Sequence, residues 1–423
     1  MVYTNEQRVL LLALHPIPGI EENIELGKLV SSNLDWQQIT DSAIWHGVAQ
    51  IVYKNLLAFL NQDTVPYEIL EELKKLYQKN RIRNTIVLNE VEQVYHSLND
   101  SLIPAIPLKG AFLTPNVYRD VGLRPMSDVD LLIKKSDLDE INTILLSLGY
   151  QLNEPDLYDH QIKNHYHIQY FNLKRKILIE LHWGVWASHH SHFFNSNDFR
   201  LVDNFWARAI KYRNDLDSIK VLHPNDLLIM LLLHFIQHRF VGHNEKGFRN
   251  KGTLLQLCDI VRAIRYYDEK INTAQFMREV EHLGLTKVIV ASLCIVQQIF
   301  QEWPTPGFNT TWNMNPTTED KEFIEIIIKN MFVRVEPFGN IPKSILNLRY
   351  EDSFLKILKK LFFEVFPPPD ILSKKLNKEI NYRLFSIHYI TRPFKLLSKF
   401  INLLLKPFRL NDEIKLRNWI KLG

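Results

Sequence analysis

Two aspartates interrupt an otherwise apolar segment, SDVDLLIKK at residues 127–135. Polar and apolar residues alternate there with a period of two, which predicts a strand. Asp128 and Asp130 then project from the same face. The core-facing positions are Val129, Leu131 and Ile133. Adjacent carboxylates on a sheet repel each other unless a cation lies between them, so the segment predicts a strand with a cation-binding face.

A third acid, Glu180, lies in the apolar run ILIELHW at residues 177–183. Burying a carboxylate in such a strand is costly unless a partner compensates it. If the two strands are neighbours, Asp128, Asp130 and Glu180 form one metal-binding and catalytic set for Mg²⁺ or Mn²⁺, with carboxylate, water and phosphate ligands. Two such ions stabilise in-line attack at a phosphorus atom.

A phosphate-binding element is predicted at Lys109-Gly110, where an apolar strand ends and a short helix begins. Glycine lets the backbone approach a ligand closely, and helix N-terminal amides favour phosphate oxygens. Lys109 and Arg124 supply positive charge, and Ser127 and His182 complete the predicted nucleotide-binding residues. The glycine motifs of P-loop and Rossmann proteins are absent from the sequence, so neither of these folds is supported.

The strand pattern is confined to the middle of the chain. Residues 103–108, IPAIPL, suit an edge-like strand because prolines bound them. A brief helix at 111–118 and a helix at 136–150 follow, the latter with Ser136 or Asp137 as N-cap and Gly149 as its stop. Two further strands, at 165–173 and 176–186, are joined by a tight turn.

Helical patterns flank this unit. Five apolar residues before position 60 are spaced as one face of a helix. They are Ile39, Ile44, Val48, Ile51 and Leu56. A long amphipathic pattern follows at 67–98, and helical patterns return from His223. The sequence therefore predicts an α+β fold, a small mixed-sheet core between helical regions. The expected divisions are 1–100 (helical), 101–200 (α/β core), 201–302 (helical support) and 319–423 (helical with a basic tail).

These motifs occur in a familiar order. Leu108-Lys109-Gly110 is followed by a loop from Tyr118 to Arg124, by Asp128-Val129-Asp130-Leu131 and by Ile179-Glu180-Leu181-His182-Trp183. Over about residues 25–300 the chain resembles an uncharacterised bacterial nucleotidyltransferase family of the DNA polymerase β-like superfamily. The resemblance implies that Asp128, Asp130 and Glu180 bind metal and that Gly110 lies at the nucleotide phosphates.

One position departs from the superfamily pattern. The wider superfamily has serine after the glycine, and this chain has Ala111. A serine contact to phosphate is therefore missing, and Lys109 is its expected substitute. This departure supports an alternative in which the fold persists as a degenerate nucleotide-binding or regulatory module.

The expected reaction uses a divalent cation and a nucleoside triphosphate, with ATP favoured. It transfers a nucleoside monophosphate to an acceptor hydroxyl, phosphate or carboxylate and releases pyrophosphate. Positioning and charge neutralisation supply most of the rate. The acceptor class stays open among small molecules, sugar phosphates, peptides and proteins. An RNA-modifying transferase is a further alternative.

Structural roles compete with several of these assignments. Arg124 is equally well explained as one half of a surface ion pair. His182 could touch substrate or orient Glu180, and it is equally well explained as a packed, hydrogen-bonded histidine. Asp259 lies in an apolar helical pattern, where Arg262 or Arg265 is its expected partner.

The remaining histidines do not indicate a zinc site. The histidine-rich segment 160–192 has no nearby cysteine and no HExxH motif, so a polar loop beside the site is favoured over zinc. His234 and His238 are expected to line the cleft or the core.

Charge is distributed unevenly along the chain. The net charge is +4, but from Lys374 onward twelve lysines and arginines face three acids, a balance of +9 that leaves about −5 for the rest. A basic helix packed on the core is the favoured interpretation of this tail. A peripheral membrane contact stays open, and a nucleic-acid contact is less favoured.

The N-terminal sequence, the short apolar runs and the cysteines predict a soluble cytoplasmic protein. Residues 1–16 lack the basic region and cleavage site of a signal peptide. The longest apolar run, about residues 227–236, is roughly half the ~20 residues that a membrane span needs. Cys258 and Cys294 both lie in apolar helical patterns and are expected to be buried thiols.

Overall fold

The structure is a computed structural model. It describes residues 3–16, 20–59, 64–185, 198–240, 251–300, 316–332, 415 and 419. The chain divides into two compact units, one comprising 1–236, 250–333 and 420–423 and the other comprising 237–249 and 334–419. The sheet and the site belong to the first unit. The predictions for the tail after Lys374 and for the histidines at 189–192 lie outside the described residues.

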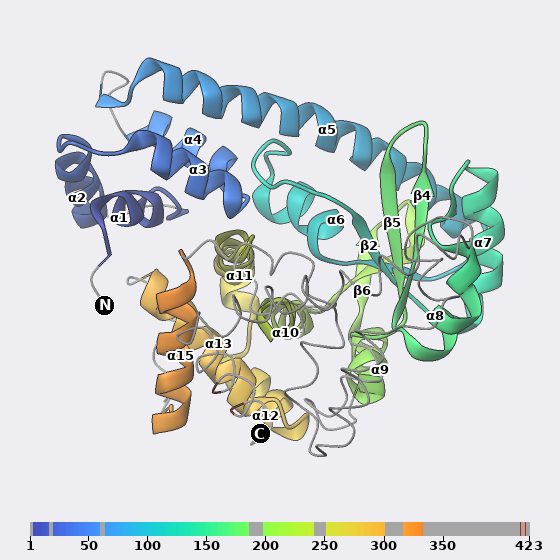
Figure 1. The fold of residues 1–423 in the computed structure, drawn as a ribbon. Helices are drawn as coiled ribbons and strands as arrows, with labels where there is room; N and C mark the ends of the chain where they lie inside the picture. The colour runs from blue at the N-terminus through green and yellow to red at the C-terminus, as the bar shows by residue number, and fades with distance from the viewer. Residues whose placement is uncertain are drawn as a thin grey trace, which may run out of the picture. The chain divides into compact units, whose positions relative to one another are not determined.

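The N-terminal hundred residues are helical, as predicted. The helices are α1 (Asn5–Leu12), α2 (Ile20–Val30), α3 (Trp36–Trp45), α4 (Ala49–Phe59) and α5 (Tyr67–Asp100). The predicted single helical face at 39–56 is divided between α3 and α4, because Gly47 adopts a φ of 71° between them. Helix α5 continues from these helices to the sheet (Figure 1).

A mixed seven-stranded sheet forms the centre of the unit, as the predicted fold class requires. Its strands are β1 (Ala105–Pro107), β2 (Val129–Ile133), β3 (Gln151–Leu152), β4 (His167–Asn172), β5 (Ile177–His182), β6 (Ile210–Arg213) and β7 (Leu216–Val221). Their order is β3-β4-β5-β2-β1-β7-β6. Strands β2 and β5 are parallel neighbours, as are β1 and β7; the other pairs are antiparallel.

Two expectations about the sheet were wrong. Strand β1 lies between β2 and β7 and is not an edge strand. Its only proline, Pro107, is the last residue of the strand, where a missing N–H is tolerated. The sheet also continues past residue 200, because the hairpin of β6 and β7 adds two strands where only helices were predicted.

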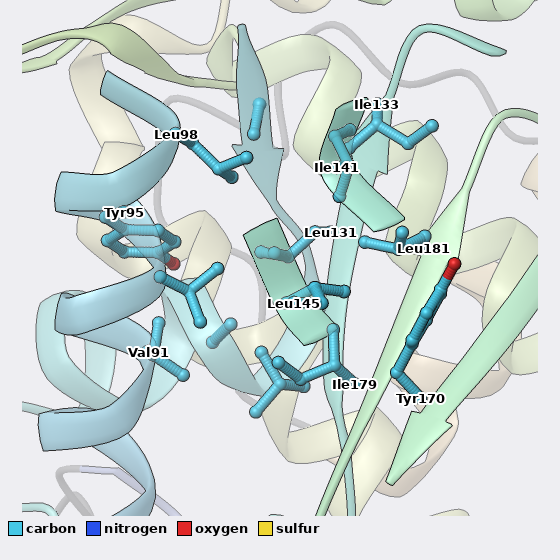
Figure 2. Packing of buried hydrophobic residues seen from close by; sticks show 14 of the residues in the cluster. Val91, Tyr95, Leu98, Leu131, Ile133, Ile141, Leu145, Tyr170, Ile179 and Leu181 are labelled. Carbon is cyan, nitrogen blue, oxygen red and sulfur yellow. The ribbon is translucent and has the colours of Figure 1, made fainter. Parts of the chain in front are cut away.

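One face of the sheet is an apolar core covered by α5 and by α7 (Leu138–Ser147) (Figure 2). Leu131, Ile179 and Leu181 point into it, and Tyr95 of α5 faces them (Figure 2). Each of the three aliphatic side chains is fully buried, which confirms Leu131 as a core-facing position. Because strand residues alternate between faces, Asp130, Glu180 and His182 lie on the opposite face.

Helices return from Pro224, as predicted, whereas the helices at Tyr158–Asn164 and Asp198–Arg208 had no sequence prediction. A short α6 (Lys109–Leu113) continues into a π-helical turn, Thr114–Tyr118. The remaining helices are α8 (Tyr158–Asn164), α9 (Asp198–Arg208), α10 (Pro224–Phe240), α11 (Thr253–Tyr267), α12 (Thr273–His282), α13 (Thr286–Ile299) and α15 (Thr318–Asn330), with 3-10 turns at Lys135–Asp137, Pro155–Leu157 and Asp268–Lys270.

Both cysteines are free and buried, as predicted. Among the described residues, every helix is too short or too polar to cross a membrane.

Candidate active site

The pairing register brings the acids of distant segments together. Strands β2 and β5 pair in parallel with Asp130 opposite Glu180, and β4 pairs with β5 so that Gln169 is opposite Glu180. Residues opposite each other on neighbouring strands project from the same face. The three side chains therefore form a polar row across three adjacent strands.

Asp130 is the centre of this site, and its side chain is almost wholly enclosed, with the residue 1% exposed. Its Oδ1 lies 2.8 Å from Nζ of Lys109 and 2.9 Å from Nε2 of His182. The same Nε2 lies 3.3 Å from Oε2 of Glu180. Oε1 of Glu180 accepts a 2.6 Å hydrogen bond from Gln169. Three groups, Lys109, His182 and Gln169, thus compensate the two carboxylates.

Asp128 is placed differently from the prediction. Strand β2 begins at Val129, so Asp128 precedes the strand and does not belong to it. Its Oδ1 accepts a 2.9 Å hydrogen bond from Ser127. Burial, together with the negative charge of Asp130, raises the pKa of Asp128 to about 6. A carboxyl group with this pKa is one whose charged form lacks a sufficient positive partner.

The other two acids stay ionised. Burial raises the pKa of Asp130, but Lys109 and His182 outweigh it and hold that pKa well below its usual range. Burial acts on Glu180 in the same way, and the hydrogen bond from His182 brings its pKa to about 2. Burial lowers the pKa of His182, but its hydrogen bonds to both carboxylates leave it above the ordinary value.

The Lys109-Gly110 pair lies directly beside Asp130, since the backbone N–H of Leu108 donates to the Asp130 carbonyl at 3.0 Å. Lys109 has a φ of 42°, an unusual conformation for a non-glycine residue and one found at functional sites. A Cβ on Gly110 would lie 2.6 Å from Nη1 of Arg124, so the position admits glycine alone without rearrangement. Helix α6 has five residues, in agreement with the short helix that was expected after Lys109-Gly110.

Arg124 is held inside the protein. Its Nε and Nη2 donate to the two carboxylate oxygens of Asp259 on α11, both at 2.8 Å. Tyr118 also donates to Asp259, at 2.8 Å. Asp259 is thus the buried partner of an arginine, as expected, but that arginine is Arg124, whereas Arg262 or Arg265 had been suggested. Arg262 packs over the Tyr118 ring. Arg124 also lies against the turn at Gly110. A contact between Arg124 and a nucleotide stays a prediction.

The loop that carries Arg124 is anchored by α5. Nδ2 of Asn84 donates to the backbone carbonyls of Val121 and Arg124, at 2.6 and 2.8 Å. Asn80 donates to the carbonyl of Gly122 at 2.8 Å. Both asparagines are buried in a helix whose pattern indicated only packing. Their amides satisfy carbonyls that the irregular loop would otherwise leave unpaired.

The donor set fits a divalent cation. Asp130, Glu180 and His182 each offer one ligand atom, and these atoms all lie within 4.8 Å of one another. Asp128 does not belong to this group; it lies after the Arg124 loop and immediately before β2. Carboxylate oxygens with an imidazole nitrogen are ordinary ligands for divalent metal ions in proteins. The geometry supports a cation at Asp130 and Glu180, while the assignment of Asp128 as a ligand stays a prediction.

Two polar residues of the site were missed in the sequence. Gln169 and His167 alternate on β4 with the same period of two that identified the aspartates. The His167 ring stacks on the His182 ring, with a centroid separation of 5.2 Å. Their pattern was visible, but which face of β4 adjoins Glu180 depends on pairing with β5.

A family model described as an uncharacterised nucleotidyltransferase matches residues 32–301, more than half of the chain. The chain belongs to this nucleotidyltransferase family. The match spans α3 to α13 and contains the whole sheet and every residue of the site. Comparisons with curated proteins and with solved structures found no significant match. Family membership supports nucleotidyl transfer as the general activity of this nucleotidyltransferase.

Proposed function

We propose that this nucleotidyltransferase moves a nucleoside monophosphate from a nucleoside triphosphate, with ATP favoured, to an acceptor hydroxyl, phosphate or carboxylate, releasing pyrophosphate. One observation carries the proposal. Asp130 and Glu180 are register partners on adjacent parallel strands, and Lys109 contacts Asp130. The chain belongs to a nucleotidyltransferase family, and it places the acids Asp130 and Glu180 beside the cation of Lys109. This arrangement suits a substrate that carries phosphate groups and an associated metal ion.

Asp128, Asp130 and Glu180 would hold Mg²⁺ or Mn²⁺. A bound divalent cation supplies charge neutralisation at the phosphates and polarises a phosphoryl oxygen. The three acids carry more negative charge than Lys109 alone balances, so a cation fits the site electrostatically. Asp128, whose charged form is the least compensated of the three, is the residue that gains most from such an ion.

The chain's own residues position the reactants. Lys109 provides a positive charge for the departing pyrophosphate. Gly110 has no side chain, so the Lys109-Gly110 turn can lie against Arg124. Glu180 accepts a hydrogen bond from the acceptor oxygen and so orients it toward the phosphorus atom. Ser127 orients Asp128 by its 2.9 Å hydrogen bond. Such positioning, together with charge neutralisation, provides most of the catalysis in phosphoryl and nucleotidyl transfer.

The direct test follows the nucleotide into a product. Full-length protein is incubated with ATP labelled at the α-phosphate, with Mg²⁺ or Mn²⁺ and with a cell extract as the source of acceptors. Asp130→Asn keeps the shape of the side chain but removes its charge, and we expect transfer to fall at least about a hundredfold. The matched control is Asp217→Asn, a surface carboxylate paired with Lys211, which should leave transfer unchanged.

Retained transfer in Asp130→Asn, with circular dichroism showing an unchanged fold, contradicts the assignment. Calorimetry separates the alternatives when no transfer is found. ATP binding that requires a divalent cation but yields no labelled product supports the degenerate binding module favoured by Ala111. Label that enters RNA, with binding that weakens steeply as salt rises, supports the RNA-modifying alternative.

A further inference from the structure

His182 is directed at both acids of the candidate metal site. Its Nε2 lies 2.9 Å from Asp130 Oδ1 and 3.3 Å from Glu180 Oε2, so one ring nitrogen is directed at both acids. The residue is only 4% exposed. The site therefore combines two carboxylates and one imidazole nitrogen, whereas the sequence had predicted carboxylates alone as ligands.

The backbone fixes this arrangement. Strand β5 places Glu180 opposite Asp130 and His182 opposite Leu132, so Glu180 and His182 leave the same face two residues apart. The His182 ring is backed by His167, stacked at 5.2 Å, and by Tyr166 at 5.8 Å. These two ring contacts limit rotation of the His182 ring away from the acids. A preorganised imidazole of this kind is suited to bind an ion without rearrangement.

Charge balance favours the same conclusion. With Asp128, Asp130 and Glu180 ionised and Lys109 charged, the site carries a net charge of −2 when the imidazole is neutral. One divalent cation brings this sum to zero. A neutral imidazole with its proton on Nδ1 presents a lone pair at Nε2 to the ion.

We propose that Nε2 of His182 is a direct ligand of the divalent cation, together with Asp130 and Glu180, and that the centre prefers a first-row transition-metal ion to Mg²⁺. The inference rests on the proposed function, because it specifies the cation of that same site. Mg²⁺ favours oxygen ligands in near-ideal octahedral geometry, whereas imidazole suits transition-metal ions. A mixed nitrogen and oxygen set thus discriminates by ligand chemistry.

The competing interpretation is that His182 only donates a hydrogen bond and orients the two acids. In that case the ion is bound by oxygen atoms alone. The ratio of Mn²⁺ affinity to Mg²⁺ affinity is then the same with and without the imidazole. The two interpretations differ in whether a histidine nitrogen is bonded to the metal, which is a spectroscopic question that needs no acceptor.

Mn²⁺ is the probe, added to the full-length protein without nucleotide. Electron paramagnetic resonance measures the bound ion, and electron spin-echo modulation detects nitrogen bonded to it. We expect nitrogen modulation in the unaltered protein, and we expect its pattern to change when all histidines carry the heavier nitrogen isotope. This second measurement needs no variant, so it does not depend on how a substitution folds.

The variants then assign the nitrogen. His182→Gln should abolish the modulation and weaken Mn²⁺ binding by at least about tenfold, since loss of even an outer partner of a metal ligand costs about 10–100-fold in affinity. His282→Gln is the matched control, an exposed histidine at the end of α12 that lies outside the ligand group. It should keep the modulation. Mg²⁺ should compete for the site at least about tenfold less effectively in the unaltered protein than in His182→Gln.

Three results overturn the inference. If Mn²⁺ binds to the unaltered protein without nitrogen modulation, or if His182→Gln keeps the modulation, His182 is not a ligand and the proposed transferase stands on its carboxylates. If Mn²⁺ does not bind at all, with or without ATP, both the inference and the metal-dependent reaction fail.

Discussion

The two faces of the sheet are built from alternate residues of the same strands. One face forms the core, and the other carries the candidate site. On one face Leu131, Ile179 and Leu181 pack against α5 and α7 (Figure 2). On the other face Asp130, Glu180 and His182 surround a point where buried charges meet. The apolar face stabilises the fold because it removes apolar surface from water. The polar face destabilises it because it holds like-charged carboxylates close together. The comparison shows that a single strand period can position a site directly on a rigid core.

The largest expected effect tests whether the polar side also contains an element needed for stability. Arg124→Met removes the partner of Asp259, which is 2% exposed, and breaking such a buried pair costs about 3–5 kcal/mol. The measurement is thermal unfolding of full-length protein, followed by circular dichroism. A drop in stability would show that the loop below Gly110 depends on the Asp259 pair as strongly as the core depends on its side chains.

The double variant Arg124→Met with Asp259→Leu provides the control. Because it removes both charges, it should recover much of the stability that the single change loses. An unchanged melting temperature in Arg124→Met would contradict the structural role of the pair. It would favour the prediction that Arg124 contacts the nucleotide.

The next effect breaks the apolar face. Leu131 follows Asp130 in β2 and is fully buried, and Leu131→Ala should destabilise the protein by about 2–5 kcal/mol through lost burial and a residual cavity. Mn²⁺ binding, measured well below the melting temperature, should change little because the side chain faces away from the site. A large loss of metal affinity with normal stability would disprove the separation of the two faces.

The smallest effect sharpens the polar face and has the opposite sign. The pKa of Asp128 is about 6 in the folded protein and 3.8 in an unfolded chain, so ionisation opposes folding. The penalty is complete above pH 6 and absent below pH 3.8. With a chelator present, Asp128→Asn should therefore stabilise the protein at pH 7, on the order of 1–3 kcal/mol, since one pKa unit equals about 1.4 kcal/mol.

That gain should disappear as the pH falls toward 4, and a saturating divalent cation should remove it at pH 7 as well. Unfolding by denaturant at pH 4 and pH 7 measures both dependences. If Asp128→Asn destabilises the metal-free protein at pH 7, the carboxylate has a compensating partner and the charge argument fails.

Local pattern was sufficient for much of the site. The period of two identified the strand at Val129–Ile133 and the face of Asp130, and the apolar run around Glu180 identified β5. These features concern neighbours in sequence, whose side-chain directions follow from backbone geometry alone. The same reasoning missed the division of α3 from α4, because helical spacing continues across the single positive φ of Gly47.

The assembly of the site was decided by tertiary structure. Arg124 and Asp259 are 135 residues apart, and nothing in either local pattern selects this pair over Arg262 or Arg265. Strand β1 reads as an edge strand from its prolines, but β7, more than a hundred residues later, pairs with it. Long-range pairing depends on loop closure and on the packing of whole elements, which a local period does not contain.

The sequence by itself determined that this chain has an acidic strand face, a Lys-Gly turn before it and a third acid on a later strand. These follow from residue type and period. Only the tertiary structure decided that Asp130 adjoins Glu180, that His182 is directed at both, and that Arg124 belongs to Asp259. The physical reason is that charge and direction are properties of single residues, whereas a binding geometry is a property of register between strands.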